Sequence, residues 1–179
     1  MLKNGCLRLK NLLKYGRNEL QIRYDQCFQQ KKGYGEQTDS ILSLYPNRKY
    51  RGEPFYHSLR YSYTFEDRLQ AGFVAEKDAG EPFWNAYHKG YDFYSAHLFL
   101  KDINWLKSLA IGDYKMSFGQ GLVISNDFSP SRTAVVAQAE RRTNGFRRHF
   151  STNEQDFFRW VASTITIRNL DISVFYSYR

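Results

Sequence analysis

The stretch SLRYSYTFEDRLQAGFVAEK, residues 58–77, decides the fold class. Over residues 59–65 the odd-numbered positions are apolar or aromatic and the even-numbered ones are polar, and the alternation resumes after the charged turn at Asp67. A period of two is typical of β-strands with one apolar and one polar face. Folding the chain about Asp67 sets Tyr61 opposite Phe73, so the apolar residues of both strands share one side. The stretch therefore predicts an antiparallel hairpin whose strands, about ten residues each, are long enough to cross a membrane.

The rest of the chain repeats this alternation. Further strands are predicted at residues 7–13, 20–28, 94–100, 109–124, 157–167 and 170–177. Gly119 and Gly121 lie inside one of them and predict a bulge or a close approach of two backbones. Together with the hairpin, the segments give about eight strands in a single region that covers residues 1–179.

The connections between the predicted strands alternate in length. Short turns are predicted near Gly16, at 66–68, at 102–104 and at 168–169, and long loops at 30–56, 78–90 and 126–156. Outer-membrane barrels have short turns on the periplasmic side and long loops outside, whereas a soluble sandwich need not sort its loops in this way. The sequence therefore predicts an all-β fold, an antiparallel up-and-down transmembrane β-barrel or part of one.

The composition bounds the kind of protein. The 179 residues include 14 Tyr, 14 Phe and 3 Trp, and aromatic side chains favour strands and membrane interfaces. No run of about eighteen apolar residues predicts a transmembrane helix. Residues 1–16 lack the pattern of a signal peptide, and residues 174–179 stop within a strand pattern, so we expect a fragment of a longer chain.

The alternation alone leaves open which strand face points inward. Ionisable residues on the polar face would line a wet lumen in a membrane barrel, or face solvent in a soluble one. The aromatic content favours the membrane barrel. The candidates for lining the lumen are Arg23, Asp25, Arg60, Glu76, Asp113, Lys115 and Asp171. The candidates for facing lipid are Leu59, Tyr61, Tyr63, Phe73, Tyr114, Ile172 and Tyr176.

Two segments carry a resemblance to a known family. AEKDAGEPF at residues 75–83 and GDYKMSFGQGL at residues 112–122 resemble the β-barrel region that follows helix-hairpin-helix repeats in certain outer-membrane proteins of Gram-negative bacteria. The likeness extends from about residue 55 onward. It implies a membrane-embedded barrel in the cell outer membrane, attached in the longer protein to a helical part associated with sequence-independent DNA binding. It implies no catalytic residues.

The residues predict neither an enzyme nor a cofactor. The four His have no Cys, Asp or Glu at metal-ligand spacing, so no metal site is predicted, and no Gly-x-Ser-x-Gly motif marks a nucleophile. The predicted pairing of the first two strands sets Cys6 opposite Cys27. A disulfide and two free thiols both fit this arrangement, because a register slip of one residue would separate the pair.

The net charge of +8 predicts an anionic partner or simply basic loops. The most basic patch supplies the anion-binding candidates Arg141, Arg142, Arg147 and Arg148, which are interleaved with Phe146 and Phe150. Cations that hold phosphate beside aromatics that stack on bases are typical of nucleic-acid binding. The other interpretation is a basic loop that pairs with nearby carboxylates or contacts lipopolysaccharide phosphates.

Two functions follow from the sequence. The first is an outer-membrane β-barrel segment that contacts outer-membrane lipid and acts as a pore, a transport scaffold or a surface-anchoring platform. The alternative is a soluble basic all-β module that binds single-stranded nucleic acid.

Overall fold

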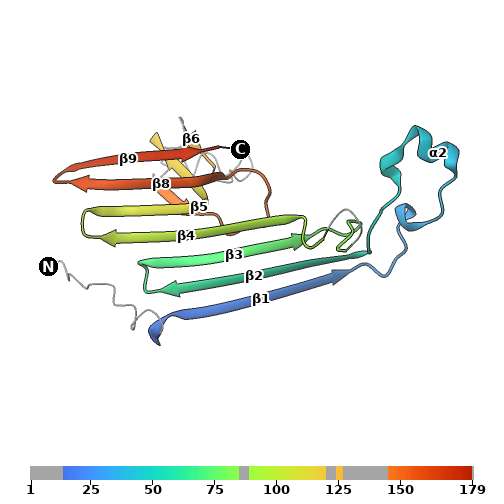
Figure 1. Cartoon of the computed structure of the whole chain (residues 1–179), viewed down its shortest axis with the longest axis horizontal. Helices are drawn as coiled ribbons and strands as arrows, with labels where there is room; N and C mark the ends of the chain where they lie inside the picture. The colour runs from blue at the N-terminus through green and yellow to red at the C-terminus, as the bar shows by residue number, and fades with distance from the viewer. Residues whose placement is uncertain (1–13, 85–88, 120–123, 127–144, 179) are drawn as a thin grey trace, which may run out of the picture. The chain divides into compact units, whose positions relative to one another are not determined.

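The computed structural model describes residues 14–84, 89–119, 124–126 and 145–178 (Figure 1). It confirms the all-β prediction, because these residues form a nine-stranded antiparallel sheet with little helix. The strands are β1 (Arg17–Gln26), β2 (Phe55–Phe65), β3 (Leu69–Lys77), β4 (Phe93–Ile103), β5 (Leu106–Phe118), β6 (Ile124–Ser125), β7 (Gly145–Arg148), β8 (Phe158–Ile167) and β9 (Leu170–Ser177). Their order is β1-β2-β3-β4-β5-β8-β9, and β6 and β7 also pair with β5.

The connections alternate as predicted where the structure describes them. Tight turns join β2 to β3, β4 to β5 and β8 to β9, and each contains a residue with positive φ: Glu66, Asn104 and Arg168. The connections of β1 to β2, β3 to β4 and β5 to β8 are long. The first of these contains the short helices η1 (Lys32–Tyr34), α2 (Asp39–Leu44) and η2 (Pro46–Arg48). The strand predicted at residues 7–13 lies outside the described residues.

None of the helices in the described part of the chain has the length and apolar character needed to cross a membrane.

The described residues form two compact units. One comprises those within 1–19, 61–73 and 95–179, and the other those within 20–60 and 74–94. The first unit holds most of β4 and all of β5 to β9, and the second holds the long loops that follow β1 and β3.

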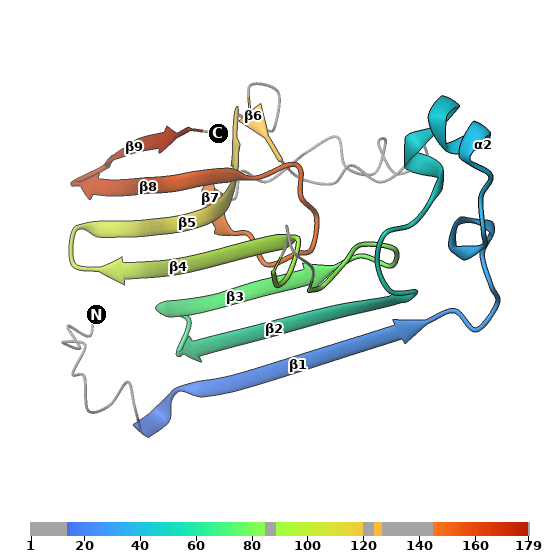
Figure 2. The same ribbon diagram turned by 45° about the vertical axis from the view of Figure 1, so that its right-hand side comes forward.

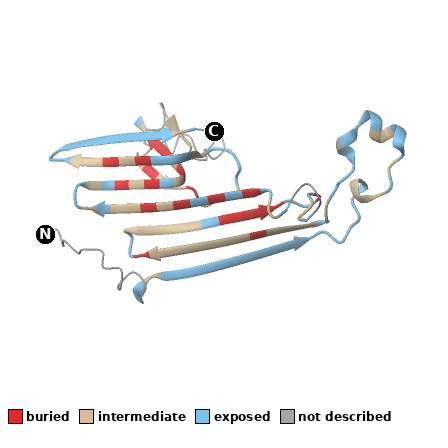
Figure 3. Ribbon diagram, in the orientation of Figure 1, coloured by how far each residue is buried: buried red, intermediate tan, exposed pale blue. Residues whose placement is uncertain are grey.

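The core of the first unit lies on one face of β4, β5, β8 and β9. Phe99 pairs with Ala110, and Ala110 pairs with Ala162, so these side chains share a face. They form a buried cluster with Tyr114, Met116 and Phe146, against which Phe118, Ile124 and Phe158 pack. Because β7 and β6 supply Phe146 and Ile124, these two short strands cover this inner face. Figure 3 shows the buried positions spaced along β4, β5 and β8.

A bend in β5 makes this covering possible. Residues 106–114 of β5 pair with β8, whereas residues 114–117 pair with β7 and Ser117 and Phe118 pair with β6. Gly112, between the two parts, has a φ of +90°, and its partner Trp160 has a φ of +110°. Figure 2 shows the carboxyl-terminal part of β5 turning away from β4 toward β6. Of the two glycines predicted to mark an irregularity, Gly119 directly follows the end of β5 and has a φ of +60°, and Gly121 lies outside the described residues.

We expect Gly112→Ala to lower the free energy of unfolding by more than ~2 kcal/mol. A Cβ at this position would lie 2.2 Å from the backbone oxygen of Ala96, in a conformation that is already strained for an L-residue. Gly145→Ala is the matched control, because Gly145 also has positive φ, +62°, but no atom lies within 4 Å of the place that its Cβ would occupy. Gly145→Ala should lower the free energy of unfolding by only about 1 kcal/mol. Guanidinium unfolding followed by tryptophan fluorescence measures both values, and equal losses would contradict the close packing at Gly112.

Candidate functional site

The outer face of β4, β5, β8 and β9 is apolar from strand to strand. Directly paired residues in an antiparallel sheet point to the same side. One cross-strand row on this face contains Leu98, Ile111, Val161 and Tyr176, a second contains Leu100, Leu109, Ser163 and Val174, and a third adds Ile165 and Ile172. Val174 is 63% exposed and Tyr176 is 60% exposed. A soluble protein normally buries such a face. Here the other five residues of these rows are half-buried, whereas the exposed ones are Ile111, Val161, Ile172, Val174 and Tyr176, and the buried core residues of β4, β5 and β8 lie on the opposite face.

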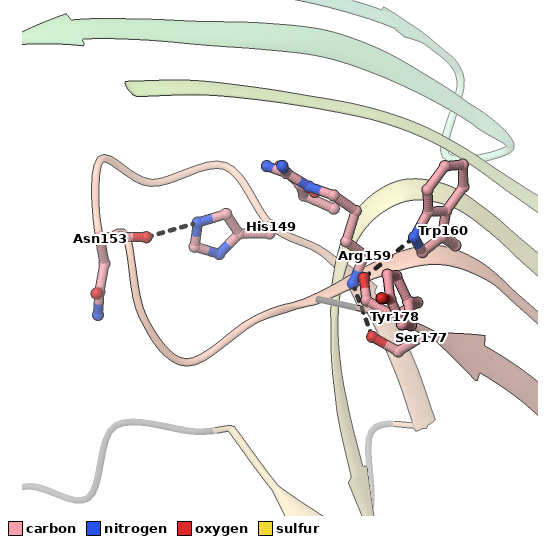
Figure 4. A network of polar contacts seen from close by, with 7 residues as sticks. His149, Asn153, Arg159, Trp160, Ser177 and Tyr178 are labelled. Carbon is pink, nitrogen blue, oxygen red and sulfur yellow. Dashed lines mark hydrogen bonds and ion pairs between the residues drawn. The ribbon is translucent and has the colours of Figure 1, made fainter. Parts of the chain in front are cut away.

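Aromatic side chains with a polar group lie at both ends of these strands. Trp105 occupies the turn between β4 and β5, and its carbonyl oxygen accepts from the N–H of Thr166 near the end of β8. At the other end, the Nε1 of Trp160 donates to the carbonyl oxygen of Tyr178 at 3.1 Å (Figure 4). All three aromatic side chains are more than half exposed. Trp and Tyr are enriched where apolar strands meet the membrane–water interface.

The inner face contains a polar cavity of about 620 Å³ next to the core. Ser108, Thr164 and Ser173 line it from three neighbouring strands, and the Thr164 and Ser173 hydroxyls lie 2.9 Å apart. Lys107 and Phe118, at opposite ends of β5, both line it too. In a straight strand these two residues would be roughly 35 Å apart. The bend in β5 therefore builds the cavity.

An ion pair forms part of the cavity wall. Lys107 donates to the carboxylate of Asp171, which also accepts from the Thr166 hydroxyl at 2.6 Å. Asp171, a lumen candidate, thus lies on the inner face. Lys101 and Asp102 from β4 also line the cavity. The four charged residues balance, because two are lysines and two are aspartates.

The other lumen candidates are distributed over both units. Asp113 is 2% exposed and accepts two hydrogen bonds from Arg159, at 2.6 and 3.0 Å. In the second unit, Arg23 and Asp25 form an exposed ion pair of 2.5 Å along β1. The remaining three are half-buried or buried: Arg60 in β2, Glu76 in β3 and Lys115 in β5.

Most lipid-facing candidates keep exposed surface. Phe73, Ile172 and Tyr176 are at least 40% exposed, and Leu59, Tyr61 and Tyr63 are half-buried. The rings of Tyr61 and Phe73 lie 5.9 Å apart, which agrees with the predicted hairpin register.

Tyr114 differs from the rest of this set. It is fully buried, and its ring contacts Phe146 and Phe158, each with centroids 5.9 Å away. Its hydroxyl donates to the carbonyl oxygen of Tyr176 at 3.0 Å. Tyr114 is therefore a core residue and not a lipid-facing one, because it lies four residues after Ala110 in β5 and so shares its inner face.

The predicted anion-binding patch is only partly within the described residues. Arg141 and Arg142 lie outside them, while Arg147 and Arg148 belong to β7 and are half-buried. The guanidinium carbon of Arg148 lies 5.2 Å from the centroid of the Phe150 ring. These two arginines are therefore packed against the protein itself.

Two buried histidines adjoin this patch, and sequence reasoning did not find them as site residues. His97 of β4 is 5% exposed and contacts Phe150 edge-on, with ring centroids 5.3 Å apart. His149 has no exposed surface and stacks on Phe157, with centroids 4.6 Å apart. His149 follows the end of β7, where no period applies, and the alternation of β4 does not show which of its faces is covered, so only tertiary packing shows that these rings are buried.

The hydrogen bonds of His149 show which of its ring nitrogens carries a proton. Its backbone N–H donates to the Asp113 carbonyl oxygen at 3.0 Å, and its Nε2 lies 3.1 Å from the carbonyl oxygen of Asn153 (Figure 4). Because a carbonyl oxygen only accepts, Nε2 carries the proton. Burial lowers the pKa of His149 below its usual value, the nearby Lys115 lowers it further, and Asp113 opposes both.

The second unit contains a buried lysine at the start of a long loop. Lys77 has no exposed surface, and its Nζ donates to the Phe55 carbonyl oxygen at 3.0 Å and lies 3.4 Å from the Glu53 carboxylate. Hydrogen bonds from backbone N–H groups, its own and that of Phe83, are the main cause that lowers the pKa of Glu53. These contacts fasten the loops to the strand ends. His57 does the same, since its Nδ1 lies 2.8 Å from the hydroxyl oxygen of Tyr91.

The described residues include no group of three His, Cys, Asp or Glu side chains that could hold a metal ion. Cys27 is exposed, and Cys6 lies outside the described residues, so their pairing stays a prediction.

Comparisons with known proteins return no match. No family model matches the chain, no curated protein matches it, and no solved structure matches it. The resemblance to the barrel region that follows helix-hairpin-helix repeats therefore stays a prediction.

We expect acid to weaken the packing of residues 149–157. The pKa of His149 is lowered in the folded chain, so below the ordinary value of 6.5 the unfolded chain binds more protons than the folded one. The stabilising contribution of the neutral, buried His149 to the free energy of unfolding is therefore complete above about pH 6.5, and it falls as the pH drops below that value. His149→Phe keeps an aromatic ring against Phe157 and should reduce this pH dependence. Guanidinium unfolding at pH 7.5, 6.5 and 5.5 measures it, and an equal pH dependence in both proteins would refute the role of His149.

Proposed function

We propose that this chain is a membrane-embedded segment of an outer-membrane β-barrel that acts as a pore or transport scaffold, with lipid in contact with the outer face of β4, β5, β8 and β9. One observation carries the proposal. Exposed apolar residues of β5, β8 and β9 share one face, while the opposite face holds the cavity and the Lys107–Asp171 ion pair. Lipid-facing barrel strands distribute apolar and polar residues in this way, whereas soluble sheets reverse the distribution.

The length of the strands supports the same environment. β8 has 10 residues, which corresponds to ~33 Å at a rise of about 3.3 Å per residue. Tilted by ~40°, such a strand spans ~25 Å, the height of the apolar band of an outer-membrane barrel. The aromatic residues at both ends of these strands fit the two interfaces that border this band.

The residues on the inner face bear on how wide the interior of the proposed barrel would be. In the described residues the sheet order ends at β1 and β9, and these two strands do not pair with each other. A closed barrel of about eight strands is filled by side chains, and more strands leave room for a channel. Because β6, β7 and their core residues occupy part of the inner face, we propose a narrow or gated interior rather than a wide pore.

Two partners follow from this proposal. The apolar face contacts outer-membrane lipid. The loop between β1 and β2 carries the basic residues Lys31, Lys32, Arg48, Lys49 and Arg51, which would meet lipopolysaccharide phosphates at the outer surface. A DNA-binding helical part attached to the barrel is a proposal that rests on the family resemblance alone.

The structure gives no specific support to nucleic-acid binding. Stacking on bases needs aromatic rings whose faces are open. Phe150 instead contacts the guanidinium of Arg148 and the edge of His97, and Arg159 is held by Asp113. Within the described part of the patch, Phe146, Arg148 and Phe150 are therefore engaged within the protein.

Detergent dependence tests the proposal directly. We expect the full chain to need detergent or lipid to stay in solution, and to migrate differently on a gel before and after heating. Protease protection in liposomes should cover β4, β5, β8 and β9. A stable monomer in buffer without detergent, with no protection by liposomes, would exclude the membrane barrel.

A charge on the outer face should block insertion. Val174 is 63% exposed, so Val174→Arg would change the stability of a soluble protein by less than ~0.5 kcal/mol. In a bilayer the same change should cost about 2–4 kcal/mol near the midplane. Ser173→Arg is the matched control, because the neighbouring residue faces the cavity, where Asp171 and Asp102 can pair with the new cation. Folding yield into liposomes measures both variants, and equal yields would contradict the assigned faces.

A further inference from the structure

We propose that the inner cavity binds a neutral polyhydroxylated solute of the size of a small sugar. This inference rests on the proposed function for its meaning, because the cavity faces a lumen only if the sheet belongs to a barrel. Its chemistry can nevertheless be argued from the cavity alone. The volume of about 620 Å³ lies within the range of small-molecule sites, about 300–1,000 Å³.

The hydroxyl groups of the cavity form a row across three strands. Ser108 of β5 pairs with Thr164 of β8, and Thr164 pairs with Ser173 of β9. Neighbouring strands are ~4.8 Å apart, so the row offers hydroxyls at short, regular intervals. Each hydroxyl can donate one hydrogen bond and accept two. Such groups suit a ligand whose own hydroxyls both donate and accept.

The charges of the cavity argue against a ligand with net charge. Lys101 and Lys107 are balanced by Asp102 and Asp171, and Lys107 and Asp171 are already paired with each other. A charged solute would lose its hydration on entering the cavity, and no unpaired opposite charge there would compensate for that loss. A neutral solute can still accept from a lysine and donate to an aspartate. The balance therefore favours neutral polar ligands over anions and cations.

Two aromatic rings complete the match with a sugar. Phe118 and Phe146 line the cavity on the side of β5 and β7, with ring centroids 5.1 Å apart. Small-molecule sites combine apolar and aromatic walls with a few placed polar groups. A sugar ring has the corresponding two aspects, a C–H face that packs on aromatic carbon and a rim of hydroxyls. A simple ion or a water molecule would gain no favourable contact from the aromatic side of the cavity.

Titration of the full chain in detergent micelles with three matched sugars tests the inference. D-glucose, glucuronate and glucosamine share one ring and differ in charge, and isothermal titration calorimetry at pH 6.5 measures their binding. We expect saturable binding of glucose and at least ten-fold weaker binding of both charged sugars. No saturable binding of glucose, or tighter binding of either charged sugar, would overturn the proposal.

Variants locate the binding in the cavity. Thr164→Val and Ser173→Ala should each weaken glucose binding about three- to ten-fold, the loss expected for one hydrogen bond. Ser163→Ala, on the outer face of the same strand as Thr164, should leave it unchanged. Asp171→Asn frees the charge of Lys107 and should shift the preference toward glucuronate. Equal effects of Ser163→Ala and Thr164→Val, in variants that keep the mobility shift on heating, would place the binding elsewhere.

The outcomes separate this inference from the proposed function. A protein that inserts into liposomes but gives no saturable heat with glucose would overturn the sugar site and leave the barrel intact. A protein that is soluble without detergent and binds glucose would overturn the barrel and leave the cavity chemistry intact.

Discussion

The pairing of β5 is the constraint on which the first unit depends. Residues 106–112 pair with β4 and residues 106–114 with β8, and the strand then pairs with β7 and β6. The first part of β5 uses both of its edges, one for β4 and one for β8, and its last part pairs with β7 and β6. Gly112, with a positive φ, lies between the two parts and allows the strand to change direction there. Backbone hydrogen bonds are satisfied on both sides of the bend. The covered core and the cavity both depend on it.

Charged groups that this fold buries are held by oppositely charged neighbours. Asp113 is fixed by two hydrogen bonds from Arg159, and in the second unit the buried amine of Lys77 lies beside Glu53 and the Phe55 carbonyl oxygen. An unpaired buried charge would cost several kcal/mol, so such pairing is required of any stable structure. Paired charges are therefore no evidence of a catalytic site.

Local periodicity was enough to predict most of the sheet. The hairpin at 58–77 and the strands at 94–100, 157–167 and 170–177 correspond to β2, β3, β4, β8 and β9, because each alternates over a length that only a strand accommodates. The turns were predictable for the same reason, since charged or Asn-containing tripeptides interrupt the alternation. The assignment of Ile172 and Tyr176 to an exposed apolar face also follows from the period.

What the sequence could not predict depends on contacts between distant segments. β7 has only four residues, too few for a period, and its place is set by pairing with the end of β5. A bulge or a close approach of two backbones was predicted at Gly119 and Gly121, and Gly112 was not singled out, because a glycine in a sequence does not show whether it is under steric pressure. At Gly112 that pressure comes from the backbone of β4, 2.2 Å from where a Cβ would be. Tyr114 was assigned to the wrong side because alternation alone does not show which face of a strand is covered; its place four residues after Ala110 puts it on the covered one.

One face of the sheet is apolar and the other is polar, and this asymmetry limits the environments in which the fold is stable. Water would meet the row of Ile111, Val161 and Tyr176 at a cost of about 25 cal/mol for each Å² of apolar surface left exposed. Covering that row with a second protein layer would remove the cost, but it would not explain why aromatic residues with polar groups stand at both ends of its strands. Hydrocarbon bounded by two polar interfaces, as proposed above, would meet both requirements at once. In that setting the hydroxyls, the balanced charges and the cavity would lie on the side away from lipid.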